Sequence, residues 1–225
     1  MLPLRPLLVV FAGTLLFGCA TETHRAVTPT RTDAAGTSYS GDRYTLVVGK
    51  FHNRSTYLRG IFSDGVDRLG SQSKTILKTH LQETNRFVVV DRANMDEIAR
   101  EAEIRGDELA LKGAQIVLTG DVTEFGRKTT GDVQLFGILG AGKTQVAYAK
   151  VTLNVVDVRT SEIVYSATGA GEYDLSNRQV LGTGGAAGYD STLNGKVLDL
   201  AIREAVQRLV DGLQAGQWHP TSAGR

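Results

Sequence analysis

Between Ala114 and Asn194 the chain reads twice as a long strand, a glycine-rich segment and a second long strand. Polar and apolar residues alternate along these strands, which is typical of a β-strand with one buried face. The alternation is clear from Lys150 to Val155 and changes phase after Val155, which indicates a β-bulge. We therefore expect two glycine-tipped hairpins, over residues 125–150 and 164–192, and we expect the function to lie on them.

Shorter elements surround these hairpins. Asn94 and Asn194 are each placed to cap a helix, and apolar residues follow both at helical spacing. The order β-α-β-α-β-β-β-α predicts an α+β protein, an α/β-type domain whose mixed sheet is flanked by helices, with two hairpin extensions. The predicted elements outside the hairpins are a strand at 44–49, a helix from 66 to about 85, a strand at 87–90, a helix from 94 to about 104 and a long helix from 194 to about 213.

The first 18 residues read as an export signal. Arg5 precedes the apolar run LLVVFAGTLLFG, which is too short to span a bilayer and remain there. The run ends in Leu-Phe-Gly before Cys19, the single cysteine of the chain, so no internal disulfide is possible. This resembles the lipobox of bacterial lipoproteins, which implies that Cys19 is acylated as the mature N-terminus. Ala20, rather than Asp, at the next position implies the outer membrane.

Composition divides the remaining chain. Residues 19–43 are rich in Thr, Ala, Ser and Gly, with almost no large apolar residues, so we expect a flexible lipidated tether. Residues 44–215 carry the predicted elements, and we expect them to form one folded domain, which the lipoprotein resemblance implies is periplasmic. Residues 216–225 read as a tail. The formal net charge of +1 gives no reason to expect a nucleic-acid partner.

The segment Gly137 to Thr144 matches the phosphate-loop pattern G-x-x-x-x-G-K-[ST] at every position. In that motif a strand enters a glycine loop whose amides hold phosphate, and a helix begins at the lysine. Here the chain continues as QVAYAKVTLNVVDV, which predicts a strand, and the signal sends the protein to a compartment without ATP. We therefore predict a hairpin tip, where glycine supplies positive φ, and no bound nucleotide.

No other segment predicts catalysis or metal binding. Of the four histidines, His24 and His219 lie in the terminal segments, His52 lies in a loop and His80 lies on the apolar stripe of a predicted helix. The acidic residues of the second helix are typical of a solvated face. We expect no metal, no cofactor and no enzyme activity.

Several segments together carry a resemblance to a known family. They are Tyr57–Ser63 (YLRGIFS), the helix KTILKTHLQET, Phe87–Arg92 (FVVVDR), Ala114–Val122 (AQIVLTGDV), Val151–Val164 (VTLNVVDVRTSEIV), Gly188-Tyr189 and the closing helix. In this order, and over nearly the whole mature chain, they resemble the CsgG/HfaB family, the curli production assembly and transport lipoproteins.

The resemblance implies an outer-membrane secretion channel. Each subunit of such a channel contributes two β-hairpins to one shared transmembrane barrel, and a loop from each subunit forms a constriction ring. Unfolded fibre or adhesin subunits pass through this ring without ATP hydrolysis. The family's aromatic positions in that loop match Tyr57 and Phe62, and Ile61 stands where the family has Asn. The implied partners are further copies of the chain, the exported subunits and accessory envelope proteins.

The hairpin residues give an independent test of membrane spanning. From Phe125 to Leu135 one face includes Phe125, Val133 and Leu135, whereas the other is polar or glycine and suits a lumen. The second hairpin alternates in the same way, with Tyr165 and Tyr173 on its more apolar face. Four strands cannot close a barrel, because about eight are the minimum, so spanning would require a homo-oligomer.

Two other interpretations stay open from the residues alone. In one, the hairpins remain in the periplasm and pack on the domain or on a partner. The protein is then a tethered lipoprotein that scaffolds or activates cell-envelope assembly, with a surface structure or a cell-wall synthase as its partner. In the other, the protein is an enzyme whose catalytic residues no motif reveals.

Overall fold

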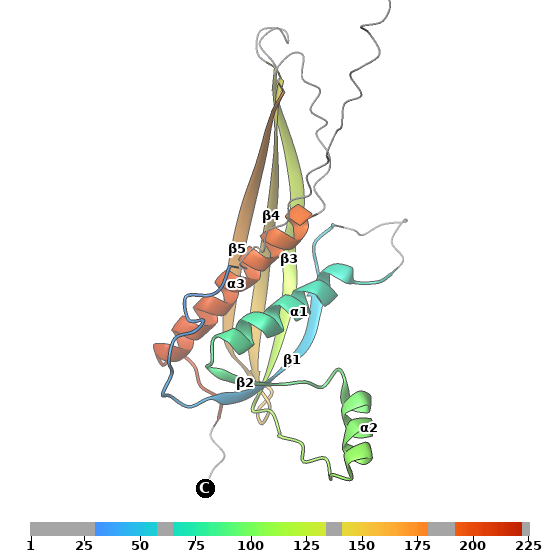
Figure 1. Cartoon of the computed structure of the whole chain (residues 1–225). Helices are drawn as coiled ribbons and strands as arrows, with labels where there is room; N and C mark the ends of the chain where they lie inside the picture. The colour runs from blue at the N-terminus through green and yellow to red at the C-terminus, as the bar shows by residue number, and fades with distance from the viewer. Residues whose placement is uncertain (1–29, 58–64, 134–140, 180–191, 222–225) are drawn as a thin grey trace, which may run out of the picture. The chain divides into compact units, whose positions relative to one another are not determined.

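The computed structural model describes residues 30–57, 65–133, 141–179 and 192–221. Residues 1–30 form one compact unit, and residues 31–225 form the main domain. Its elements follow the predicted order, and the predicted α+β class with a mixed sheet is confirmed (Figure 1). They are β1 (Tyr44–Asn53), α1 (Arg68–Glu83), β2 (Phe87–Val90), α2 (Met95–Arg105), β3 (Ile116–Val133), β4 (Ala141–Asp157), β5 (Ile163–Gln179) and α3 (Thr192–Gln214).

The five strands form a single sheet in the order β2-β1-β3-β4-β5. β1 pairs in parallel with β2 and with β3, whereas the β3–β4 and β4–β5 pairs are antiparallel. Parallel pairing of β1 with β2 needs a crossover connection, and α1 supplies it. The register of β4 against β5 shifts between Val155 and Val156, which confirms the predicted bulge.

Helices α1 and α3 lie side by side on one face of this sheet (Figure 1). α1 packs on β1, β2 and β3, and α3 packs on β4 and β5. Their buried residues recur at helical spacing, as in Leu77 and Leu81 of α1 and Ile202 and Leu209 of α3. Each such side chain contributes about 1.5–3 kcal/mol on burial. In the described part of the chain no helix packs on the opposite face, which we call the open face.

Two glycines of β5 let α3 approach the sheet closely. A Cβ atom added to Gly169 would collide with the backbone of Ala201 and Ala205, and one added to Gly171 would lie 2.9 Å from a side-chain carbon of Leu200. These glycines therefore serve close packing between helix and strand, a use that is separate from turn formation.

The residues after α3 contribute to the core. Trp218 is buried, donates from its indole nitrogen to the carbonyl of Leu209 at 3.1 Å, and stacks between Phe87 and Tyr165. Nearby, the Asp157 carboxylate accepts from the backbone amides of Thr221 at 2.6 Å and Arg159 at 2.8 Å. These hydrogen bonds lower the pKa of Asp157 to about 2, because they favour its charged form. The described residues of the predicted tail are thus part of the folded domain.

The described part of the predicted tether, from residue 31 to residue 43, also lies against the domain. Thr32 and Ala34 are buried. The guanidinium of Arg86, itself buried, donates to the carbonyls of Ala34 at 3.2 Å and Thr37 at 3.4 Å, and it lies over the ring of Tyr39. Composition alone does not reveal this, because most of the contacts are made by backbone carbonyls and small side chains, with one tyrosine ring.

Residues 91–114, which we call the arm, carry α2 away from the sheet (Figure 1). Every residue of α2 is described, and none is buried. Asn94 precedes α2 as predicted, but its side chain donates to Asp91 and does not cap the helix. α2 ends at Gly106, which adopts the left-handed conformation, and residues 107–112 have no regular secondary structure.

Candidate functional site

The region where the loop after β1 meets the base of the long strands is our candidate site. Asp67 holds the two ends of this loop together. One carboxylate oxygen accepts from the amide of Asn53, the last residue of β1, at 2.8 Å. The other accepts from the amide of Gly70 at 2.7 Å and so caps α1. The loop that the resemblance assigns to a constriction therefore leaves from a fixed base.

Tyr57 lies at the entry to this loop and is half-buried. Its ring centroid is 4.7 Å from that of Phe125 on β3, and the two rings are tilted by 59°. Asn53 fixes the backbone there, because its side-chain amide donates to the Tyr57 carbonyl at 2.8 Å. Phe125 is buried, so this ring pair extends the core to the foot of the long strands.

Asn194 joins three parts of the molecule at the same place. Its amide group donates to the Tyr57 hydroxyl at 2.7 Å, and its amide oxygen accepts from Arg127 of β3 at 2.8 Å. α3 begins at Thr192, so Asn194 lies inside its first turn and is not the predicted capping residue. A loop, a strand and a helix are thus tied together. No sequence pattern reveals this contact, because Asn194 is 67 residues from Arg127 and 137 residues from Tyr57.

Beyond this junction β3, β4 and β5 continue as a ladder without α3. Residues 128–133 of β3 pair with residues 141–146 of β4, and these pair with residues 174–179 of β5. Figure 1 shows the three strands running past the end of α3. We call these 18 residues the ladder. The predicted hairpins start at residues 125 and 164, but Phe125 and residues 164–171 lie below the ladder, in the helix-covered sheet. β3 and β5 therefore extend beyond the helices from a later residue than predicted.

The sequence-predicted site residues are only partly described. Tyr57 lies at the junction, whereas Ile61 and Phe62 fall in residues 58–64 and Cys19 in residues 1–29, all outside the described residues. The segment that resembles a phosphate loop is described from residue 141 onward. Lys143 and Thr144 lie in β4, paired with β3 and β5, where the phosphate-loop motif needs the start of a helix.

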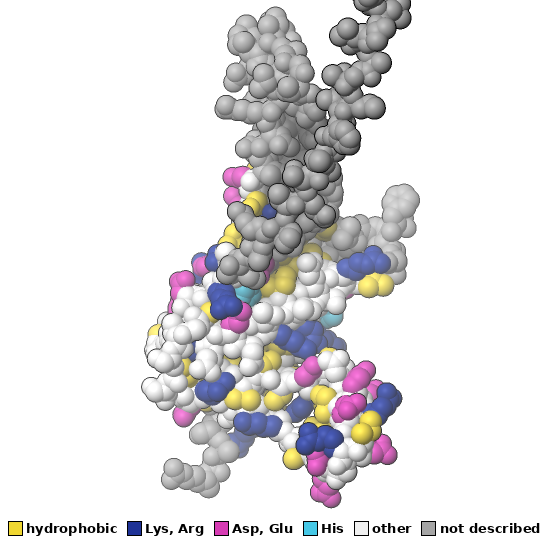
Figure 2. All heavy atoms as spheres, viewed as in Figure 1, with side chains coloured by type: hydrophobic (Ala, Val, Ile, Leu, Met, Phe, Trp, Pro, Cys, Tyr) yellow, Lys and Arg dark blue, Asp and Glu magenta, His cyan; other side chains and the backbone are white. Residues whose placement is uncertain are grey.

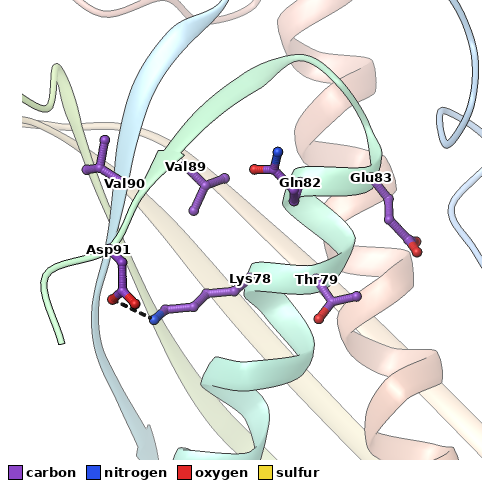
Figure 3. Close-up of a pocket in the computed structure, with 7 residues that line it drawn as sticks. All are labelled: Lys78, Thr79, Gln82, Glu83, Val89, Val90 and Asp91. Atoms are coloured by element: carbon purple, nitrogen blue, oxygen red, sulfur yellow. Dashed lines mark hydrogen bonds and ion pairs between the residues drawn. The ribbon is translucent and has the colours of Figure 1, made fainter. Parts of the chain in front are cut away.

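The domain also has a shallow groove between α1 and the edge strand β2 (Figure 3). Its volume is about 390 Å³, and Val89 points into it from β2. At one end Lys78 forms an ion pair with Asp91 at 3.1 Å. The amide of Ala93 and the Lys78 ammonium bind the Asp91 carboxylate and lower its pKa to about 2. This groove has no group placed for chemistry, and its ion pair fixes the base of the arm.

His80 is buried as the sequence predicts and joins the two helices. Its Nε2 atom is 2.9 Å from a carboxylate oxygen of Asp199 on α3. Among the described residues there is no group of three or more side chains that could hold a metal ion. None of the helices in the described part is long and apolar enough to cross a membrane.

Comparison with known proteins gives the following similarities. The family model described as "Curli production assembly/transport component CsgG" matches residues 30–223. A protein of Neisseria meningitidis serogroup B, described as "Putative lipoprotein NMB1126/NMB1164", is 60% identical over 209 residues, which cover 93% of this chain and 94% of that protein.

Two solved structures show weaker similarity. The PelC dodecamer from Paraburkholderia phytofirmans has 18% sequence identity and a TM-score of 0.36, with 75% of this chain and 93% of that chain covered. Lipoprotein GNA1162 from Neisseria meningitidis has 16% identity and a TM-score of 0.36, with 76% and 99% covered. The family model spans most of the chain, and on that ground this protein belongs to the CsgG family of curli production assembly/transport components.

Proposed function

We propose that this protein is an oligomeric outer-membrane lipoprotein of the curli secretion channel type. Its copies form a pore through which unfolded fibre or adhesin subunits leave the cell without ATP hydrolysis. Family membership supports the proposal, and one structural observation carries it. The ladder extends three hydrogen-bonded strands beyond the junction, through six paired rows in which β3, β4 and β5 continue together.

The size of the ladder suits this role. Six described rows at about 3.4 Å each add about 20 Å to the strands beyond the junction. A membrane-spanning strand needs about 9–11 residues, so the described rows supply more than half of one. A few strands from one copy cannot surround a channel, and the pore therefore requires several copies. Cys19 anchors each copy by its acyl chains, and more than one chain is needed for stable attachment.

The junction supports the loop that would narrow such a pore. Asp67 and Asn53 fix the ends of the loop, and Tyr57 is held by Asn194 and Phe125. In the proposal Tyr57, Ile61 and Phe62 from every copy form the constriction. The proposed transport has no step that requires a nucleotide, which agrees with the position of Lys143 within β4 and not at the start of a helix.

The test uses the full-length lipidated protein, extracted in detergent. Class-averaged electron micrographs should show rings, and the protein should form channels in planar bilayers. The matched variant is Cys19→Ser, which should not be acylated and should leave the outer membrane. Rings that form no channels would contradict the pore proposal. Cys19→Ser protein that still carries an acyl chain would contradict the assignment of Cys19 as the anchor.

A second candidate function is a non-pore lipoprotein that scaffolds or activates cell-envelope assembly. The observation that favours it is the polarity at the foot of the ladder, where Lys128, Glu172 and Asp174 are all exposed. Limited proteolysis of outer-membrane fragments that are open to protease on both sides separates the two. A pore protects the ladder from protease, whereas a scaffold leaves it open to cleavage from the periplasmic side.

A further inference from the structure

The arm carries apolar side chains that its own domain leaves uncovered. Of the large apolar residues exposed in the described part of the chain, Ile98, Ile104, Leu109 and Leu111 all lie in the arm. Figure 2 shows apolar side chains among charged ones over α2. Within α2, apolar residues recur at helical spacing along one side, namely Met95, Ile98, Ala99 and Ala102.

An isolated helix as short as α2 is marginal in water. Helices below about 12–15 residues seldom persist without tertiary packing, and α2 has 11 residues, none of them buried. Its ends are nonetheless fixed. Asp91 binds Lys78 and the amide of Ala93, and the Arg92 guanidinium donates to the carbonyl of Lys112 at 2.5 Å, which ties the two ends of the arm together. The arm is thus held out from the domain with its apolar side available.

The open face of the sheet has a matching apolar feature. Five β-branched residues are paired in one row across all five strands, and the row consists of Val90, Val47, Val117, Val156 and Ile163. Val117 lies between the buried Ile116 and Leu118 and therefore points to the open face, and residues paired in register share a face. We call this set the apolar row. Ile163, at its β5 end, is 61% exposed.

The dimensions of the two features agree. Five neighbouring strands place the ends of the row about 19 Å apart. An 11-residue helix is about 16 Å long, so α2 can cover most of the row. The arm leaves the sheet at Val90, the β2 end of the row, whereas the row extends away from it to β5. A contact between the arm of one copy and the row of another joins two different surfaces, and a head-to-tail contact of this kind forms a ring when its rotation closes.

We propose that α2 of one copy packs across the apolar row of the next copy. The proposal rests on the oligomer of the proposed function and identifies the contact that builds it. The apolar side of α2 faces the row, and its acidic side, with Asp96, Glu97 and Glu101, stays in solvent. The occupant of the open face is thus a second copy of this chain.

Disulfide trapping tests the contact in the full-length lipidated protein. Ile98→Cys and Val117→Cys are combined in one chain, and the detergent-extracted protein is oxidised with copper phenanthroline. We expect a series of disulfide-linked dimers and larger species on a non-reducing gel. The matched control combines Arg100→Cys with Val117→Cys. Arg100 is two residues from Ile98 and lies on the other side of the helix, so it should give little product.

A second variant measures the contribution of the contact. Ile98→Asp places a charge in the apolar contact and should raise the protein concentration needed for half-assembly by about tenfold or more. Arg100→Asp makes a charge change on the other side of α2 and should shift it much less. Both positions are exposed in the single chain, so the melting temperature of the domain should not change.

The outcomes separate this inference from the proposed function. Wild-type rings, together with disulfide-linked species from the Ile98→Cys and Val117→Cys pair, support both. Wild-type rings without those linked species, or with equal product from the Arg100 control, overturn the contact and leave the pore proposal intact. A disulfide within single chains places the arm on its own sheet and also overturns the contact. A wild-type protein that forms no rings removes the proposed function, and the contact between copies is lost with it.

Discussion

The lower and upper parts of β3, β4 and β5 belong to the same strands but depend on different surroundings. In the lower part alternate residues are buried under α1 and α3, as with Leu118, Val151 and Leu153. In the ladder the sequences are KTTGDV, AGKTQV and DLSNRQ, which have few large apolar residues, although the strands pair in continuous register. The ladder thus continues by backbone pairing, whereas burial of apolar side chains under the helices stabilises the lower part.

This contrast shows which part of the sheet a single copy stabilises by burying its own side chains. Net stabilisation from a backbone hydrogen bond is about 0.5–1.5 kcal/mol, and burial of one large apolar side chain adds about 1.5–3 kcal/mol. We expect substitutions in the lower sheet to change the free energy of unfolding strongly, and substitutions in the ladder to change it little.

The largest expected effect is at Trp218, which closes the core below the sheet. Trp218→Ala should lower the free energy of unfolding by about 3–5 kcal/mol, because it removes a buried aromatic side chain. Trp218→Phe keeps a ring between Phe87 and Tyr165 and should cost less. Urea unfolding followed by far-UV circular dichroism measures both. Equal stability of Trp218→Ala and wild type would show that the lower part does not depend on this contact.

A smaller effect is expected at the contact between β5 and α3. Gly169→Val forces side-chain atoms against the backbone of Ala201 and Ala205 and should cost about 1–3 kcal/mol, or more if α3 separates from the sheet. The matched control is Ala170→Val, because Ala170 is exposed on the next position of the same strand. Thermal melts compare the two. If both variants melt alike, close packing of α3 is not what supports this part of β5.

Acid should weaken the lower part through Asp157. Its folded pKa of about 2 lies below the usual value of 3.8, so its contribution is fully present above about pH 4 and is lost as the pH falls toward 2. Asp157→Asn should lower the melting temperature at pH 7 and flatten its fall between pH 4 and pH 2. Melts across this range test the sign, and an unchanged acid slope in the variant would assign the loss to other carboxylates.

A modest effect is expected at the junction between the two parts. Tyr57→Phe removes the hydroxyl that Asn194 binds and should cost about 0.5–1.5 kcal/mol, while the contact with Phe125 remains. Tyr57→Ala should cost more, because it also removes the ring. If the pore proposal holds, Tyr57→Ala should raise single-channel conductance as well. Conductance that changes in neither variant would limit Tyr57 to a structural role.

The smallest effect is expected in the ladder, at the segment that resembles a phosphate loop. Lys143→Ala should leave the melting temperature and channel conductance nearly unchanged, because Lys143 lies in β4 and not at the start of a helix. Equilibrium binding of labelled ATP to wild type and variant completes the test. Clear binding by the wild type that is lost in the variant would contradict this interpretation.

Much of the fold could be predicted because local patterns and burial agree in the lower part. The alternation around Val155, the strand at Phe87–Val90 and the apolar stripe of α3 each follow from spacing alone. Sequence spacing could not reveal the junction, since Tyr57, Arg127 and Asn194 meet only through tertiary structure. The role of Gly169 was hidden for a similar reason: a glycine in a strand fits a turn or a close approach until the helix above it is known.

The burial of Trp218 also bears on how the chain folds. Its neighbours Phe87 and Tyr165 come much earlier in the chain, and contacts such as that of the Ala34 amide with Gln207 join residues 173 positions apart. Folding should be slow for the size of the domain, because such distant contacts carry a large loop-closure cost. Synthesis proceeds from the N-terminus, so the chain cannot complete this core until Trp218 has been added. Nascent or truncated chains that lack Trp218 should therefore stay open, with exposed apolar surface for chaperones to bind.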